Sequence, residues 1–331
     1  MKQYAKAVLW LLIFAAGLVG MDRMMRRDDG KIRYDVFFED QAGFDMLLLG
    51  NSHMLDGVYP IELWRDHGIV SFNVGNTGEP IGNTYWTLRL LMEHHKPQVA
   101  LIDVSYIDRT ESMHTFAHDF LDQLPLSVEK IRAVYELFPE GKRQEFLFPL
   151  TLYHSRWEEY ISGKPELYMN VHPCMFGAEL RVGRHAPDPY ERTQALSAQP
   201  PAGEPWLRRL IEMCQQEGIE PVLVAIPFPA TQETQQGINS VQVVADEYGV
   251  SFLNLFDVPG LVDFETDCYD AGSHLNPDGA TKVTAYVGCW LAENCELPDR
   301  RTDPDYAHWN AALEEYKKLR SDTWSSMSTI D

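Results

Sequence analysis

A serine follows a short apolar run near the start of the chain, in residues 46–53 (MLLLGNSH). An apolar run of this length that stops at a glycine is typical of a fully buried parallel strand. Because ligands in open α/β sheets bind beyond the carboxyl ends of such strands, Ser52 is a candidate nucleophile. The alternative is that Ser52 only caps the helix that follows.

A second polar cluster, residues 267–276 (DCYDAGSHLN), contains the partners that such a serine needs. His274 can take the hydroxyl proton, and Asp270 can hold the imidazole in the right tautomer. Asp267 is the alternative carboxylate for that role. This chemistry requires two loops far apart in sequence to meet at one edge of a sheet. The alternative is that His274 is only a surface or capping residue before a helix.

The segments around these clusters alternate between two periodicities. Short apolar runs predict five strands, and segments with apolar residues at helical spacing separate them. This alternation is typical of an α/β domain with a parallel sheet and helices on both faces. The predicted strands are 46–50, 69–74, 99–104, 221–226 and 250–255.

The strand rhythm stops in the middle of the chain, which predicts a discontinuous domain. We expect the α/β domain to comprise 28–108 and 203–295, with a helical tail at 296–331. Residues 109–202 show aromatic-rich helical patterns and no strand rhythm, so they predict a large helical insertion. The insertion is expected to form a lid or cap; the alternative is a separate helical subdomain.

Residues 1–27 have the composition of a membrane-targeting segment, with lysines before the apolar run 7–21 and arginines after it. About fifteen apolar residues fall short of the ~20 that usually span a bilayer. We predict an uncleaved signal anchor, with a cleaved signal peptide as the alternative. The larger number of basic residues after the run would by itself place the body in the cytoplasm.

The charge of the chain excludes one class of partner. A formal net charge of −21 over 331 residues argues against nucleic-acid binding, which needs a basic surface. The five cysteines form no CxxC pair. His114 and His118 have metal-ligand spacing beside Asp119, but no third ligand is evident, so we predict no metal site.

Three short motifs together resemble the SGNH, or GDSL-like, hydrolase superfamily. They are residues 50–53 (GNSH), residues 75–76 (GN) and the Asp270…His274-Leu275-Asn276 motif. The motifs are most similar to a membrane-anchored branch that includes the D-alanyl-lipoteichoic-acid accessory protein and the alginate O-acetylation proteins. The resemblance covers 44–108 and 203–295, and it implies a three-layer α/β/α flavodoxin-like fold.

By this resemblance Ser52 is the nucleophile, His274 the general base and Asp270 its orienting carboxylate. The resemblance also implies an oxyanion hole formed by the backbone N–H groups of Ser52 and Gly75, with Asn76 as a further donor. Three neighbouring side chains are expected to contact substrate: Asn51, His53 and Asn276. For His53 the alternative is that it only fills the turn at the end of the strand.

The chain departs from the family pattern at three points. Asn51 replaces the usual aspartate, and Asp270 stands four residues before His274 instead of three. Residues 102–106 (IDVSY), which correspond to the block that normally supplies an oxyanion-hole asparagine, contain none.

The resemblance implies an extracytoplasmic, membrane-anchored serine esterase or O-acyltransferase that needs no cofactor. Its expected substrate is a cell-surface polysaccharide or a teichoic-acid-like glycopolymer, and its expected partner is a membrane-bound O-acyltransferase. Two alternatives are open. One is a non-catalytic accessory protein that binds glycopolymer within an acylation complex, and the other is an esterase that faces the cytoplasm.

Overall fold

The computed structural model describes residues 2–26, 28–111, 114–162, 170–186, 191–270 and 274–327. The chain divides into two compact units, each described separately below. The helical unit comprises Met1–Lys31 and His118–Tyr168, and the α/β unit comprises Ile32–Ala117 and Met169–Asp331. The described residues 170–186 and 191–202, expected in the insertion, therefore belong to the α/β unit.

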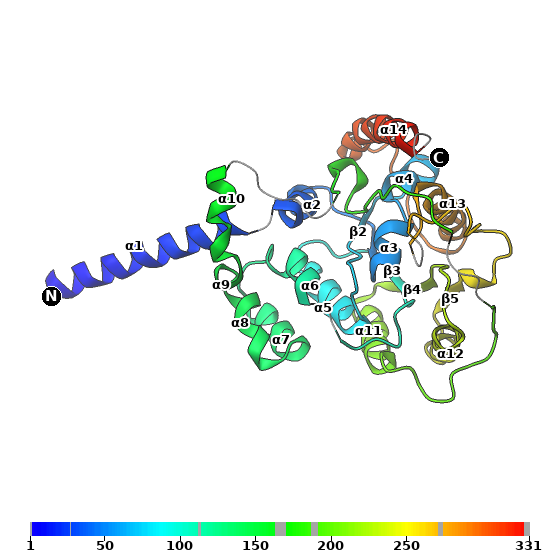
Figure 1. The fold of residues 1–331 in the computed structure, drawn as a ribbon, viewed down its shortest axis with the longest axis horizontal. Helices are drawn as coiled ribbons and strands as arrows, with labels where there is room; N and C mark the ends of the chain where they lie inside the picture. The colour runs from blue at the N-terminus through cyan, green and yellow to red at the C-terminus, as the bar shows by residue number, and fades with distance from the viewer. Residues whose placement is uncertain are drawn as a thin grey trace. The chain divides into compact units, whose positions relative to one another are not determined.

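The α/β unit is built on one all-parallel sheet of five strands in the order β2-β1-β3-β4-β5 (Figure 1). This is a flavodoxin-like order, and it confirms the predicted α/β class. The central strands of the sheet are apolar runs in the sequence because helices cover both faces of the sheet. The strands are β1 (Met46–Leu49), β2 (Ser71–Asn73), β3 (Val99–Asp103), β4 (Glu220–Ala225) and β5 (Ser251–Asn254).

The helices of this unit form a layer on each face of the sheet. On one face α13 (Pro277–Asn294) packs against α3 (Ser52–Gly57) and α4 (Pro60–His67). The other layer contains α5 (Ile81–Leu91), α11 (Glu204–Glu217) and α12 (Gln232–Tyr248). The sequence patterns anticipated all of these except the short helix α3.

The strand order reverses at β1, which lies between β2 and β3. In a doubly wound sheet this reversal is where ligand sites form. The chain leaves β1 through Gly50, whose φ of 142° favours glycine. A Cβ at this position would lie 2.7 Å from the Cβ of Asp103. Glycine therefore allows the chain to leave β1 against β3 and begin α3 at Ser52.

The C-terminal segment is part of this fold. The helix α14 (His308–Met327) packs against α4 and a 3₁₀ helix at Pro173–Met175. Trp309 is fully buried, with its ring centroid 3.5 Å from that of Phe176. The residues predicted as a helical tail thus contribute a covering helix to the α/β unit.

The helical unit contains the N-terminal helix α1 (Lys2–Met25) and most of the central helices. Within α1, residues Tyr4–Met25 are long and apolar enough to cross a membrane, a property that signal sequences share. The helix continues past the predicted apolar run at residue 21. The other helices here are α7 (Val128–Leu137), α8 (Glu140–Leu147), α9 (Leu150–Tyr153) and α10 (Trp157–Ser162).

Two further helices cross the boundary between the units. They are α2 (Asp28–Glu39) and α6 (His114–Leu121). The helix α2 has no recognisable helical periodicity in the sequence. Its acidic first turn at Asp28 and Asp29 suits a helix N-terminus, where the positive end of the helix dipole attracts carboxylates.

Candidate active site

Three polar side chains at the carboxyl edge of the sheet form one hydrogen-bonded chain. The Oγ of Ser52 lies 2.8 Å from Nε2 of His274. Nδ1 of the same ring lies 2.7 Å from Oδ2 of Asp270. The other Asp270 oxygen accepts the backbone N–H of His274 at 3.0 Å. The structure therefore brings together the three residues that sequence reasoning proposed, from loops 222 positions apart.

Ser52 is the first residue of α3, and the preceding asparagine provides the cap. Asn51 Oδ1 accepts the backbone N–H of His53 at 2.8 Å. The alternative role of Ser52 as a helix cap is therefore wrong, and its hydroxyl is turned to His274 instead. The N–H of Ser52 lies in the first turn, where helical donors have no intrahelical acceptor.

A buried carboxylate explains why asparagine suits position 51. Asp103, at the end of β3, is fully buried, and burial raises its pKa to about 7. It accepts a hydrogen bond from the Ser105 hydroxyl at 2.5 Å, and the Asn51 amide also bonds to it. An aspartate at position 51 would bury a second carboxylate beside Asp103. Asn51 is thus a structural cap, and its side chain is 1% exposed. Its contact with substrate stays a prediction.

The loop with the imidazole is closed by backbone pairing at its base. Cys268 and Leu275 form an antiparallel bridge, and the N–H of Tyr269 donates to the carbonyl of His274 at 3.1 Å. This pairing accommodates the four-residue spacing between Asp270 and His274. Residues 271–273 within the loop lie outside the described part of the chain.

Asp267, the alternative orienting residue, has other partners. Its oxygens lie 2.7 and 2.9 Å from the ammonium of Lys282, and it accepts the N–H of Asp263. Asp270, not Asp267, is the carboxylate bonded to His274.

Aromatic rings surround the imidazole of His274. The rings of His53 and Tyr269 lie nearly parallel to it, with centroids 5.2 and 5.5 Å away. His53 also stacks on Phe228 at 4.2 Å, and it is only 2% exposed. The ring of His53 packs between Phe228 and His274 and so fills the turn at the end of β1. Its contact with substrate stays a prediction.

Asn276 has a structural role beside the site. Its side-chain oxygen accepts the N–H groups of Asp278 and Gly279 at the start of α13. Its amide donates to the carbonyls of Gly183 and Thr266 at 3.1 and 2.8 Å. The fully buried side chain joins the base of the His274 loop to α13. The predicted contact of Asn276 with substrate stays a prediction.

The expected oxyanion hole is only partly present. The Gly75 N–H donates to Oδ1 of Asn73 at 2.9 Å, so it already has an acceptor. The Asn76 backbone N–H donates to the Gly50 carbonyl, and the Asn76 amide donates to Phe116 at 2.8 Å. Among the described residues, the Ser52 N–H and the second amide hydrogen of Asn76 remain as donors for an oxyanion.

The sequence analysis did not predict two residues that hold the turn after β2, Asn73 and Arg33. The Asn73 amide donates to the carbonyls of Met54 and Val58, which ties the end of β2 to α3. The buried guanidinium of Arg33 donates to the carbonyls of Asn73 and Gly75 at 2.8 and 2.6 Å. An asparagine two residues before Gly75 was a usable signal for Asn73. Arg33 had none, because its segment lacked a recognisable pattern.

A second buried carboxylate lies one helical turn after the serine. Burial, reinforced by the nearby charge of Glu179, raises the pKa of Asp56 to about 7, and Arg181 at 3.7 Å opposes the rise. Tyr269, whose ring stacks on His274, donates its hydroxyl to Asp56 at 3.4 Å. Asp56 therefore connects α3 with the His274 loop.

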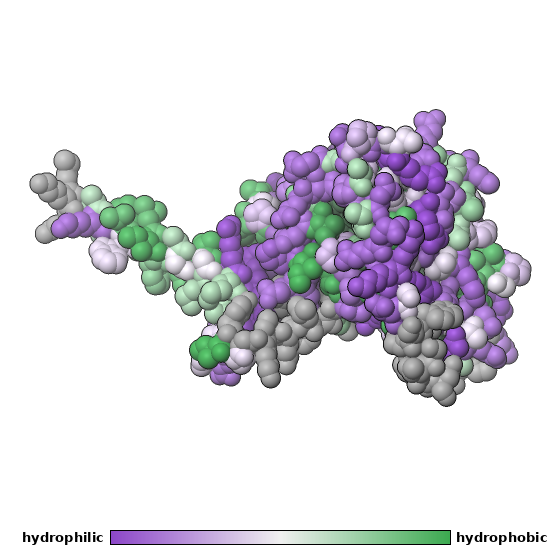
Figure 2. Space-filling model, turned by 90° about the horizontal axis from the view of Figure 1, so that it is seen from above, coloured by the Kyte–Doolittle hydropathy of each residue, from purple (hydrophilic) through white to green (hydrophobic). Residues whose placement is uncertain are grey.

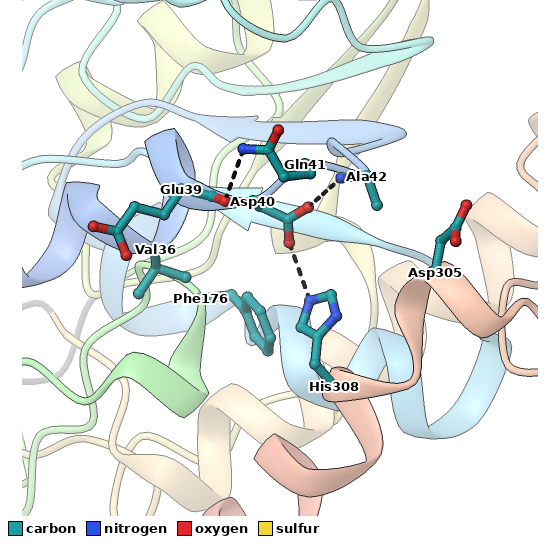
Figure 3. Close-up of a pocket in the computed structure, with 8 residues that line it drawn as sticks. All are labelled: Val36, Glu39, Asp40, Gln41, Ala42, Phe176, Asp305 and His308. Atoms are coloured by element: carbon teal, nitrogen blue, oxygen red, sulfur yellow. Dashed lines mark hydrogen bonds and ion pairs between the residues drawn. The ribbon is translucent and has the colours of Figure 1, made fainter.

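The hollows of the α/β unit include two that are lined by residues in the described part of the chain. One, of about 240 Å³, is lined by Phe256, whose ring is 5.5 Å from that of Phe228 in the aromatic group beside His274. The other, of about 340 Å³, is shown in Figure 3, where Asp40 accepts a hydrogen bond from His308. None of the residues that line the second hollow belongs to the Ser52–His274–Asp270 chain.

The histidines with metal-ligand spacing do not assemble a cluster in the described part of the chain. Nδ1 of His118 lies 3.0 Å from Asp122 in the helical unit. The side chain of His114 lies outside the described residues. No group of three metal-ligating side chains is found among the residues that the structure describes.

No protein-family model matches the chain, and no curated protein matches it.

Proposed function

We propose that the protein is a serine esterase or O-acyltransferase of the SGNH type. We further propose that α1 anchors it in the cell membrane and that it acts outside the cytoplasm on cell-surface carbohydrate. The observation that carries the chemistry is the chain of hydrogen bonds from Ser52 through His274 to Asp270. These are the distances at which a base can remove a hydroxyl proton and a carboxylate can orient that base.

In the acylation step, the Ser52 oxygen attacks the carbonyl carbon of an ester. The hydroxyl proton passes to Nε2 of His274 while Asp270 stabilises the imidazolium at Nδ1. The tetrahedral intermediate then expels the alcohol oxygen of the donor, which takes the proton from Nε2. The product is an acyl ester on Ser52.

In the second step, water or a carbohydrate hydroxyl attacks the acyl ester. His274 takes the proton of the attacking oxygen and returns it to Ser52 as the serine leaves. Transfer to a sugar hydroxyl and hydrolysis differ only in the acceptor, so the same three side chains serve both.

The strength of catalysis depends on the donors near the developing oxyanion. One preorganised donor is typically worth ~10²–10³ in turnover. Because the Gly75 N–H is bonded to Asn73, the proposed oxyanion would be bound by the Ser52 N–H and the Asn76 amide. We therefore expect slower turnover than a site with three free donors would give.

The proposed substrate and partner follow from the resemblance described above. The substrate would be a cell-surface polysaccharide or teichoic-acid-like glycopolymer, and a membrane-bound O-acyltransferase would supply or receive the acyl group. An apolar helix at Tyr4–Met25 is compatible with such a location.

Labelling with a fluorophosphonate probe and turnover of p-nitrophenyl acetate test the chemistry. The full-length protein should label and turn over, and Ser52→Ala should lose both. Ser105→Ala is the matched control, because this serine is also buried beyond the end of a neighbouring strand and contacts Asp103 instead of His274. Equal labelling of the wild type and Ser52→Ala would contradict the proposal.

A second candidate function is a non-catalytic accessory protein that binds glycopolymer in an acylation complex. The bonded N–H of Gly75 favours it, since an oxyanion hole lacking this donor stabilises a transition state less well. No labelling and no turnover in the wild type, with polymer binding retained, would support this function.

A separate experiment tests on which side of the membrane the α/β unit lies. Cys289 is an exposed thiol on α13, so an impermeant maleimide applied to intact cells should label it if the α/β unit lies outside. A Cys289→Ser variant is the control for reaction at the other cysteines. Protection of Cys289 until the cells are lysed would indicate a protein that faces the cytoplasm.

A further inference from the structure

The helical unit exposes a group of large apolar side chains on and just before α9 and α10. We call this group the α9–α10 apolar surface; it consists of Phe148, Leu152, Trp157 and Ile161. Trp157 is 50% exposed and Ile161 is 78% exposed. A contiguous segment that leaves such side chains in water commonly marks a binding surface.

This surface is held at the C-terminal end of α1. Met25 packs with Leu150 and Tyr153 in a small core to which Leu18 also contributes. Oδ1 of Asp22 accepts the N–H of Leu150 at 2.7 Å. The guanidinium of Arg156 donates to the Met25 carbonyl at 3.0 Å. The last turns of α1 and the segment from α9 to α10 therefore form one packed element, and they lie side by side in Figure 1.

The length of α1 places this element at the edge of a bilayer. The stretch Tyr4–Met25 has 22 residues. At ~1.5 Å per residue it matches the ~30 Å thickness of the hydrocarbon core. Figure 2 shows apolar side chains uncovered along this helix. When α1 crosses the membrane, Met25 lies at the boundary with the headgroups, and the attached α9 and α10 lie at the same depth.

The distribution of charge also favours a lipid surface for this unit. The helical unit contains twelve basic and twelve acidic residues, so its formal net charge is zero. The α/β unit consequently carries the whole net charge of −21. A leaflet that carries anionic lipids repels acidic proteins. The helical unit, which has no net charge, is the one of the two that such a leaflet does not repel.

We propose that the α9–α10 apolar surface inserts into the headgroup layer of the bilayer that α1 crosses. This inference rests on the proposed membrane anchor but not on the proposed acyl chemistry. The bilayer is the chosen occupant because the surface is continuous with the end of the spanning helix. Trp157 is suited to this layer, since an indole ring buries its apolar face and keeps its N–H near water.

Tryptophan quenching by brominated lipid tests the proposal on the full-length protein. The protein is reconstituted in phosphatidylcholine vesicles and in vesicles brominated near the top of the acyl chain. Trp10 on α1 is 72% exposed and reports the anchor, and Trp157 reports the α9–α10 apolar surface. We expect Trp10→Phe and Trp157→Phe each to lose part of the quenching and the double variant to lose nearly all of it. Trp290→Phe, at a partly exposed position on α13 in the acidic unit, should leave quenching unchanged.

The experiment distinguishes failure of the proposed membrane docking from failure of the proposed membrane anchor. If Trp10 is quenched and Trp157→Phe changes nothing, the anchor is present but docking on the membrane is overturned, which would leave a protein partner for this surface. If neither tryptophan is quenched, the membrane anchor fails as well. Fluorophosphonate labelling of the same variants reports separately on Ser52.

Discussion

The two loops that meet at the candidate site are held in different ways. The loop after β1 is buried throughout, with Gly50 against β3 and Asn51 bonded both to α3 and to Asp103. The loop that carries the imidazole is partly open, since the side chain of Asp270 is 38% exposed and that of His274 is 17% exposed. The sheet positions the nucleophile, whereas local hydrogen bonds position the base and its carboxylate.

This difference predicts which substitutions change turnover and which change the free energy of unfolding. The partly exposed side chains of the open loop, Asp270 and His274, can change without disturbing the core, so their replacement should alter turnover more than the free energy of unfolding. Residues of the buried loop contact the sheet on all sides, so their replacement should alter stability first.

The largest effect is expected for Asp270→Asn. The amide cannot stabilise an imidazolium at Nδ1 of His274 and favours the wrong tautomer, a change that lowers kcat by ~10⁴ in a serine protease. We expect a loss of that order in the turnover of p-nitrophenyl acetate. The free energy of unfolding should change by less than about 1 kcal/mol, because the side chain is partly exposed.

Asp267→Asn is the matched control in the same loop. Asp267 is buried and bonded to Lys282 instead of His274, so its replacement should lower stability and leave kcat nearly unchanged. A larger loss of turnover for Asp267→Asn than for Asp270→Asn would reverse the assignment of the orienting carboxylate.

A smaller effect is expected at Asp56, which joins the two loops through Tyr269. Burial raises its pKa from 3.8 to about 7. Between these values the folded protein holds a proton that the unfolded chain has lost, so stability falls as the pH rises from about 4 to about 7. A shift of about 3 units corresponds to roughly 4 kcal/mol at most. Asp56→Asn should remove this loss and be more stable than the wild type at pH 8.

Urea unfolding in detergent at several pH values measures the difference between Asp56→Asn and the wild type. The difference should be near zero below pH 4 and grow towards pH 8. Asp66→Asn on α4 is a control of opposite sign, because Arg65 lowers the pKa of this half-exposed carboxyl. A difference for Asp56→Asn that does not vary with pH would show that Asp56 titrates normally.

Most of the fold could be predicted because β1, β2 and β3 and nearly all of β4 are buried. The apolar runs at β1, β3 and β4 reflect helices on both faces of the sheet, and each run ends at a recognisable turn residue. The same reasoning placed Ser52 and His274 at one edge, since carboxyl ends of parallel strands share an edge. The short helix α3 was missed, because six residues show too little periodicity.

The parts of the site that could not be predicted depend on contacts between distant residues. The bond from the Gly75 N–H to the Asn73 side chain and the contact of Arg33 with the same turn leave no local pattern. Asn51, His53 and Asn276 were expected to face substrate because they are polar and close to the nucleophile or base. Their burial comes from Asp103, Phe228 and the carbonyls near α13, which lie far away in sequence.

The smallest expected effect is a difference in the free energy of unfolding between two glycine variants. One is Gly50→Ala, in the loop after β1, and the other is Gly260→Ala, in the segment after β5. Gly50→Ala places a Cβ 2.7 Å from that of Asp103 and puts alanine at a φ of 142°, so we expect a loss of about 2–3 kcal/mol in the free energy of unfolding. Gly260→Ala, in the segment after β5, has a φ of 70° and no atom within 4 Å of the added Cβ. Gly260→Ala should lower the free energy of unfolding by only about 1 kcal/mol, which is what an alanine loses at a left-handed φ.

Denaturant midpoints of both variants, measured with the rate of fluorophosphonate labelling, separate the two contributions. Gly50→Ala should also slow labelling, because α3 begins two residues later and carries Ser52. Gly260→Ala should leave the labelling rate unchanged. Equal losses in the free energy of unfolding for the two variants would mean that Asp103 moves easily to make room for a Cβ at position 50. The nucleophile would then be no more rigidly held than the base, since the contact between β1 and β3 is what distinguishes the two loops.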